Sequence, residues 1–213
     1  MNLSLIKFNL NNQKELNKAI NQAAAVLKAG GIVIHPTDTC YGIAANIANK
    51  KAIERIYLLK KRNYKKPLKI IVRNFKEFKK YGQYYPVIKK LINKYQPYQI
   101  SFVVPKTKAV PVFLNPRNST IGIQISNYGI CQKLLKKTGF PLIATSANIS
   151  NEKECYNLIE LFKQFNKNDP NQPPFLILYS GKLPYKKPSS VVKVISNEEI
   201  EILRLGDAGE IKI

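Results

Sequence analysis

The sequence predicts one α/β domain with a mixed sheet flanked by helices. Some segments carry apolar residues at helical spacing and others are short apolar runs typical of strands, and the two kinds alternate along the chain. The chain has 213 residues, of which 45% are hydrophobic, enough for one well-packed domain and few for two. Since no internal repeat or linker divides it, we expect residues 1–213 to form a single domain.

Five segments carry apolar residues at helical spacing. Gly30 and Gly31 close the first, because glycine readily adopts the left-handed conformation that ends helices. The second ends in a basic cluster. Pro86 precedes the third, in a position that a helix tolerates, and Gly139 closes the fourth. The predicted helices span residues 16–27, 53–60, 87–95, 130–135 and 158–165.

Eight short apolar runs predict strands. Pro36 ends the first, and Lys69 interrupts the second. The polar, proline-rich segment 166–174 is predicted to be a surface loop. The predicted strands span residues 32–35, 68–72, 100–104, 120–125, 141–144, 175–179, 191–195 and 201–205.

Charge and cysteine content limit the partners and the compartment. Thirty-five Lys and Arg against 13 Asp and Glu give a net charge of +22, which attracts polyanions such as RNA. Biased composition explains the excess equally well, because the basic residues are spread through the chain. Three cysteines without paired spacing argue against disulfides and zinc. With no apolar run long enough for a bilayer and no secretory signal, we expect a cytoplasmic protein without membrane contact.

Small hydroxyl residues follow the first predicted strand, in Pro36-Thr37-Asp38-Thr39-Cys40-Tyr41-Gly42. Open α/β sheets usually hold ligands at strand ends, and Thr37 and Thr39 can donate and accept hydrogen bonds there. Gly42 would let the backbone approach closely. Taken alone, the segment is better interpreted as an ordinary threonine-rich turn in which Asp38 caps a following segment.

A compact cationic group follows the second predicted helix. Lys60, Arg62 and Lys66 stand just before Pro67-Leu68. A triphosphate needs several cations, and arginine offers a planar fork to phosphate oxygens. The alternative is a solvated basic helix end that interacts with the helix dipole, which we favour for Lys61 and Lys65.

Residues 145–150, Thr-Ser-Ala-Asn-Ile-Ser, follow another buried strand. Ser146 and Asn148 combine a hydroxyl, an amide and exposed backbone donors, a mixture that suits phosphate and ribose. Either residue could instead cap a helix. Both interpretations are compatible, because a helix N-terminus is itself an anion site.

In this order and spacing, the three segments resemble the YrdC domain family of threonylcarbamoyl-AMP synthases. The resemblance covers about residues 17–206 and includes Ser189-Ser190-Val191-Val192 and residues 202–206. It implies a twisted, open, mixed sheet whose concave face forms the substrate pocket. It also implies that L-threonine, bicarbonate and ATP react to L-threonylcarbamoyladenylate and pyrophosphate, for the N6-threonylcarbamoyladenosine modification of tRNA. Downstream threonylcarbamoyl-transfer proteins would receive the product.

The resemblance assigns roles to individual residues. No side-chain nucleophile is needed, because the attacking carboxylate belongs to the substrate, and Mg²⁺ would be carried by the phosphates rather than by a metal site. His35 is expected to be a packing residue, and Cys40 lacks a setting that would activate it. The residues implied for ATP are Lys60, Arg62, Lys66, Thr120, Ser146, Asn148 and Arg204. Those implied for threonine are Thr37, Gln124, Ala144 and Ser189.

Two positions depart from the family pattern. Asn151 stands where the family ordinarily has glycine, a mild change because asparagine tolerates left-handed geometry. Gln124 stands where the family usually has an arginine that holds the amino-acid carboxylate. A neutral amide cannot neutralise that charge. Either a neighbouring Lys or Arg compensates, or substrate affinity is weak, or the acceptor has changed.

Two other functions stay open from the sequence. One is an RNA-binding module of the same fold, without synthase activity, that uses the basic surface to hold tRNA or double-stranded RNA. The other is a related enzyme that forms a carbamoyl- or acyl-adenylate with a different acceptor.

Overall fold

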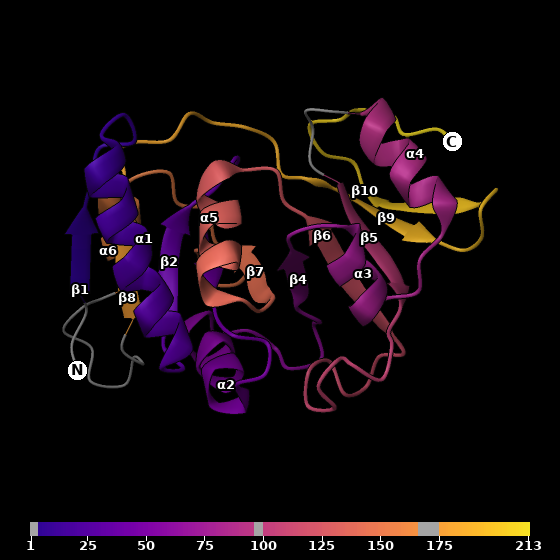
Figure 1. Cartoon of the computed structure of the whole chain (residues 1–213), viewed down its shortest axis with the longest axis horizontal. Coiled ribbons are helices and arrows are strands. Elements are labelled where there is room, and N and C mark those ends of the chain that lie inside the picture. The colour runs from indigo at the N-terminus through magenta and orange to yellow at the C-terminus, as the bar shows by residue number, and fades with distance from the viewer. Residues whose placement is uncertain (1–3, 96–99, 166–174) are drawn as a thin grey trace.

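The computed structural model describes residues 4–95, 100–165 and 175–213, and these residues form one mixed sheet with helices packed against it (Figure 1). The order of strands across the sheet is β1-β8-β2-β3-β7-β4-β6-β5-β9-β10. The strands are β1 (Ser4–Lys7), β2 (Ile32–Pro36), β3 (Tyr41–Ala44), β4 (Lys69–Val72), β5 (Ile100–Pro105), β6 (Thr120–Ile125), β7 (Leu142–Ser146), β8 (Phe175–Tyr179), β9 (Ser190–Val194) and β10 (Ile200–Arg204). The helices are α1 (Gln13–Lys28), α2 (Lys50–Leu59), α3 (Phe75–Tyr81), α4 (Pro86–Lys94), α5 (Gly129–Thr138) and α6 (Leu158–Gln164).

Parallel and antiparallel pairs are mixed across the sheet. The pairs β1–β8, β2–β8, β4–β6 and β5–β9 are parallel, whereas β2–β3, β3–β7, β4–β7, β5–β6 and β9–β10 are antiparallel. The prediction of a mixed open sheet flanked by helices is therefore confirmed.

Side chains that alternate along the strands pack into two apolar cores. Ile32 and Ile34 of β2 join a large core with α2, α3 and α4, while Val33 between them packs in a second core with α1 and α5. Because both faces of the central strands are buried, these strands are continuous apolar runs rather than alternating ones. Ile71 of β4 belongs to the second core, so the face of β4 that carries Lys69 and Ile71 is the face covered elsewhere by α1 and α5.

The predicted helices and strands are all present, with ends that differ by a few residues. Three elements were not predicted, namely β1, β3 and α3. The first is too short for a pattern, and α3 (Phe-Lys-Glu-Phe-Lys-Lys-Tyr) is dominated by charge. Strand β3 begins within the predicted threonine-rich turn, and glycine weakens the strand signal of Tyr-Gly-Ile-Ala. The predicted loop 166–174 lies outside the described residues.

The end of α2 fixes the basic segment in space. Lys61 has a left-handed φ of 47°, its N–H donates to the Leu58 carbonyl, and the Arg62 N–H donates to the Tyr57 carbonyl. This is the double hydrogen-bond pattern that closes many helices. It turns the chain sharply after Lys60. Glycine is the usual residue in this left-handed conformation. Here the residue is Lys61, whose side chain is exposed.

Asn151 confirms the expectation for its position. Its φ is +74°, in the left-handed region, where asparagine replaces glycine at moderate cost. Of the paired glycines predicted to stop α1, Gly30 has a positive φ of 79° and Gly31 does not.

Candidate functional site

The strand ends and loops named above converge on one cavity of about 450 Å³. Its lining comes from the β2–β3 loop, from β4, β5, β6 and β7, and from the segment that leads into β9 and β10. Ile71 of β4 and Cys131 of α5 also line the cavity. The cavity therefore lies beside α5, on the face of the sheet that α1 and α5 cover. Eight of the eleven predicted site residues line it: Thr37, Arg62, Thr120, Gln124, Ala144, Ser146, Ser189 and Arg204.

The β2–β3 loop is held by the hydroxyl of Thr37. Thr37 Oγ1 donates to the Cys40 carbonyl at 2.6 Å and accepts from the Thr39 N–H at 3.2 Å. A Cβ atom at Gly42 would stand 2.8 Å from Thr37 Cγ2, so glycine is required for this close approach. The hydroxyl is thus fixed within the loop that forms this part of the cavity wall.

Lys60 is placed differently from its prediction. The side chain is 2% exposed and does not line the cavity. Its Nζ donates to the carbonyls of Ser146 and Asn148, at 2.5 and 2.6 Å, and to Asn148 Oδ1 at 3.2 Å. Burial lowers its pKa to about 8, and the nearby Arg62 charge acts in the same direction. Since three acceptors use its three donors, Lys60 joins the end of α2 to the end of β7 rather than reaching into the cavity.

Asn148 belongs to the same buried junction. Its amide nitrogen donates to the carbonyls of Ile149 and Glu152, and its oxygen accepts from Lys60 and from Ser146 Oγ. The side chain is buried and is not part of the cavity lining. Ser146 does line the cavity, so Asn148 acts on the site by orienting Ser146.

Arg62 lies at the cavity wall, half-buried rather than fully exposed. Its Nε donates to the Lys66 carbonyl at 3.3 Å and its Nη2 to the Pro67 carbonyl at 2.8 Å. Lys66 is exposed outside the cavity lining, where Nζ donates to Asn151 Oδ1 at 3.3 Å. The guanidinium therefore fixes the loop that precedes β4 and still presents its charge to the cavity.

A hydrogen-bonded cluster surrounds a lysine that was not predicted for the site. Lys69 Nζ donates to Gln124 Oε1 at 2.6 Å, to Ser101 Oγ at 2.9 Å and to Ser189 Oγ at 3.4 Å. A Cβ atom at Gly122 would stand 3.0 Å from Lys69 Cβ, so glycine makes room beside the lysine. The signal was present in the sequence, because lysine is out of place inside the apolar strand 68–72.

Two further charges face this cluster. Arg204 donates from Nε and Nη2 to the Ser189 carbonyl, at 3.1 and 2.7 Å. Burial lowers the pKa of Lys69 to about 8, with the Arg204 charge acting in the same direction and Asp38 opposing it. Burial raises the pKa of Asp38, and Lys69 partly offsets that rise. The cavity lining thus combines four cations, Arg62, Lys69, Lys186 and Arg204, with the carboxyl groups of Asp38 and Glu154.

His35 and Cys40 have no reactive character. His35 is 2% exposed, and burial lowers its pKa to about 4, which keeps the ring neutral. Burial also raises the pKa of the Cys40 thiol to about 11. Among the described residues no three His, Cys, Asp or Glu side chains form a group that could hold a metal ion. None of the described helices is long and apolar enough to cross a membrane.

Lys60→Met should destabilise the fold. It removes a charged donor from two backbone carbonyls and leaves them buried without that partner, which costs about 1.5–3 kcal/mol of unfolding free energy. Urea denaturation, with Lys61→Met at the exposed neighbouring position as control, measures the loss. Equal stability of both variants would contradict the structural role.

The wild type should gain stability relative to Lys69→Met as the pH rises from 8 towards 10.5. In this window the unfolded chain keeps the Lys69 proton while the folded chain, with its pKa lowered from 10.5 to about 8, releases it. Unfolding then takes up a proton, so raising the pH favours the folded state. Urea denaturation of both proteins at several pH values tests this, and parallel curves would show that Lys69 has an ordinary pKa.

Sequence comparison adds independent information. The family model Sua5/YciO/YrdC, described as "telomere recombination", matches residues 25–206. A Buchnera aphidicola (subsp. Schizaphis graminum) threonylcarbamoyl-AMP synthase is 30% identical over 79% of this chain and 87% of its own length. A Methanocaldococcus jannaschii protein, which carries that name provisionally, is 33% identical over 93% of this chain and 91% of its own.

Solved structures share the fold. E. coli YciO is 25% identical with a TM-score of 0.78, over 99% of this chain and 97% of that one. P. abyssi Sua5 is 25% identical with a TM-score of 0.81, over 95% of this chain, which spans 57% of the Sua5 chain. The residues matched by the family model, 25–206, include all the strand ends and loops that line the cavity. This chain belongs to the Sua5/YciO/YrdC family.

Proposed function

We propose that this chain is a threonylcarbamoyl-AMP synthase, which makes L-threonylcarbamoyladenylate and pyrophosphate from L-threonine, bicarbonate and ATP. The observation that carries the proposal is the convergence of three distant segments on one cavity. That cavity combines Arg62, Lys69 and Arg204 with the hydroxyls of Thr37, Ser146 and Ser189. Curated relatives with this activity, at about the same chain length, support the same reaction.

The chemistry suits a cavity without an activated side chain. The amine of threonine captures carbon dioxide from bicarbonate, and the new carboxylate attacks the α-phosphorus of ATP. The bond from the α-phosphorus to the bridging oxygen breaks, and pyrophosphate leaves with the electron pair. Since the nucleophile belongs to the substrate, the protein needs to orient the partners and stabilise phosphate charge. Mg²⁺ enters with the nucleotide phosphates.

Arg62, Arg204, Thr120 and Ser146 are assigned to ATP. Arg62 and Arg204 each use part of the guanidinium on backbone carbonyls, so they are already oriented before a phosphate binds. Lys60 and Asn148 act one layer behind, by holding Ser146, and Lys66 supplies charge from outside the cavity lining. Thr37, Ala144 and Ser189 are assigned to threonine. Gln124, which was predicted with them, lies beside Lys69 in the same cavity.

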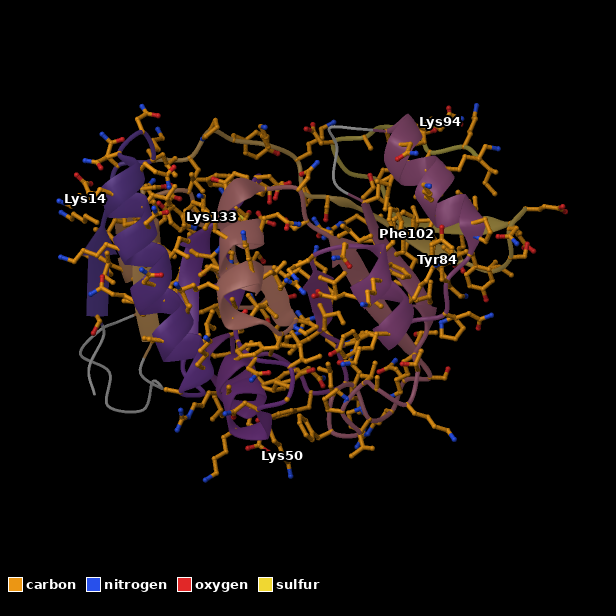
Figure 2. All side chains as sticks on the ribbon, in the orientation of Figure 1. Lys14, Lys50, Tyr84, Lys94, Phe102 and Lys133 are labelled. Carbon is orange, nitrogen blue, oxygen red and sulfur yellow. The ribbon has the colours of Figure 1, made fainter. Side chains whose placement is uncertain are left out.

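The partners and compartment follow from this activity. The product would serve the N6-threonylcarbamoyladenosine modification of tRNA through threonylcarbamoyl-transfer proteins, in the cytoplasm. The three cysteines are free and buried, which suits a reducing compartment. Figure 2 shows labelled lysines at separate places on the molecule, Lys14 on α1, Lys50 on α2, Lys94 on α4 and Lys133 on α5. These four lysines therefore lie on four different helices.

Purified protein supplied with ATP, labelled bicarbonate and L-threonine should release pyrophosphate and form a labelled adenylate that requires all three substrates. Serine and other amino acids in parallel reactions identify the acceptor. Product with another acceptor would point to a related carbamoyl- or acyl-adenylate enzyme. Salt-sensitive RNA binding without any adenylate would favour the RNA-binding module instead.

Arg62→Ala should weaken ATP binding by about 1.5–3 kcal/mol, an order of magnitude or more in affinity, because a charged contact to phosphate is lost. Calorimetric titration with ATP measures the change, and Lys61→Ala, next to it but exposed, is the matched control. Circular dichroism checks that the variant keeps the secondary structure of the wild type. Unchanged ATP affinity in the folded variant would remove Arg62 from the nucleotide site.

A further inference from the structure

Lys69 is a cation at the cavity without an anionic partner. Among the described residues, its ammonium group has no carboxylate within 4.0 Å. Its hydrogen-bond acceptors are the neutral oxygens of Gln124, Ser101 and Ser189. A partly buried charge is costly unless a counter-charge or a full set of hydrogen bonds offsets the loss of water. One of its three contacts, to Ser189, is 3.4 Å long, and no carboxylate is in direct contact, so the environment of Lys69 favours a ligand that brings a negative charge.

The contacts around Lys69 show where such a ligand can enter. The bonds to Gln124 and Ser101 are short, at 2.6 and 2.9 Å, whereas the contact to Ser189 is 3.4 Å long. Ser189 Oγ also lies 3.4 Å from Arg204 Nη2 and from Ser101 Oγ. A carboxylate oxygen placed near Ser189 can replace these long contacts with shorter ones to Lys69 and Arg204, while Gln124 and Ser101 keep the lysine in position.

We propose that Lys69 binds the α-carboxylate of the amino-acid substrate, and that Gln124 positions Lys69 rather than binding the substrate. This assignment rests on the proposed synthase function. It extends that function by naming the cation of the amino-acid subsite. Gln124 fits the positioning role because its amide oxygen accepts from Lys69, which a guanidinium at the same place could not do.

An amino acid suits this place better than a phosphate does. Lys69 and Asp38 are near enough to shift each other's pKa, so the cavity offers a positive and a negative group together. A zwitterion matches that pair, because its ammonium group can face Asp38 while its carboxylate faces Lys69. Arg204 and Asp38 are the charged groups that shift the pKa of Lys69, and Arg62, Lys186 and Glu154 also line the cavity. Arg204 adds to the attraction for a carboxylate.

The test compares two ligands and four proteins. Threonine and threoninamide, which lacks the carboxylate, are titrated calorimetrically into wild type, Lys69→Met, Gln124→Arg and the Lys69→Met/Gln124→Arg double variant, each with a non-hydrolysable ATP analogue. Lys69→Met should weaken threonine binding at least roughly tenfold and leave threoninamide and the ATP analogue nearly unchanged. Gln124→Arg alone should also weaken threonine binding, because it sets a second cation against Lys69.

The double variant should regain threonine affinity, since it moves the cation from position 69 to position 124. It also keeps the proposal testable if Lys69→Met alone does not fold. Equal loss of both ligands in Lys69→Met would show that Lys69 only shapes the cavity, and loss of the ATP analogue would show a phosphate role. Either result, or a wild type that does not bind threonine, overturns the proposal.

Measurements of adenylate synthesis distinguish a failure of the Lys69 assignment from a failure of the proposed synthase function. Adenylate synthesis by Lys69→Met with an unchanged KM for threonine would refute the carboxylate role and leave the synthase assignment standing. If the wild type binds threonine in a Lys69-dependent way but makes no adenylate, the carboxylate role stands and the synthase assignment fails.

Discussion

The ammonium group of Lys60 is the constraint on which the nucleotide side of the site depends. It connects the end of α2 with the end of β7 and the loop that follows, two segments more than 80 residues apart, through the carbonyls of Ser146 and Asn148 and the side-chain oxygen of Asn148. A lysine can make these three hydrogen bonds at once because its donors point in separate directions. The helix end that carries Arg62 and the strand end that carries Ser146 are thereby held in one arrangement before any ligand binds.

Pre-arrangement of this kind matters for a reaction without a protein nucleophile. Where the substrates supply both the attacking and the leaving group, the barrier falls chiefly through orientation and fixed charge. Arg62 and Arg204 each spend part of the guanidinium on backbone carbonyls, which limits their motion. Binding then costs less side-chain entropy than it would with free arginines.

The sequence predicted most of the fold, and eight of the eleven residues that it predicted for the site line the cavity. The differences between prediction and structure have physical causes. Apolar periodicity reports burial, so the long helices and buried strands were found, whereas short or charged elements such as α3 gave no such signal. Motif spacing reports which residues are near a site along the chain. It does not report whether a side chain points into the cavity or behind it, which is why Lys60 and Asn148 were assigned to ATP yet lie in the supporting layer.

Lys69 shows the opposite limitation. In a chain with 35 Lys and Arg, its unusual place inside an apolar strand is a weak signal, and its significance depends on contacts with residues more than 30 positions away. The departure at Gln124 is the observation that makes sense of it. A site that must neutralise a carboxylate needs a cation within hydrogen-bond range, but the strand that supplies it can change if a neighbouring strand points to the same space. Since β4 and β6 are hydrogen-bonded neighbours, the charge can sit on either, and the partner position is then free to become the neutral acceptor that orients it.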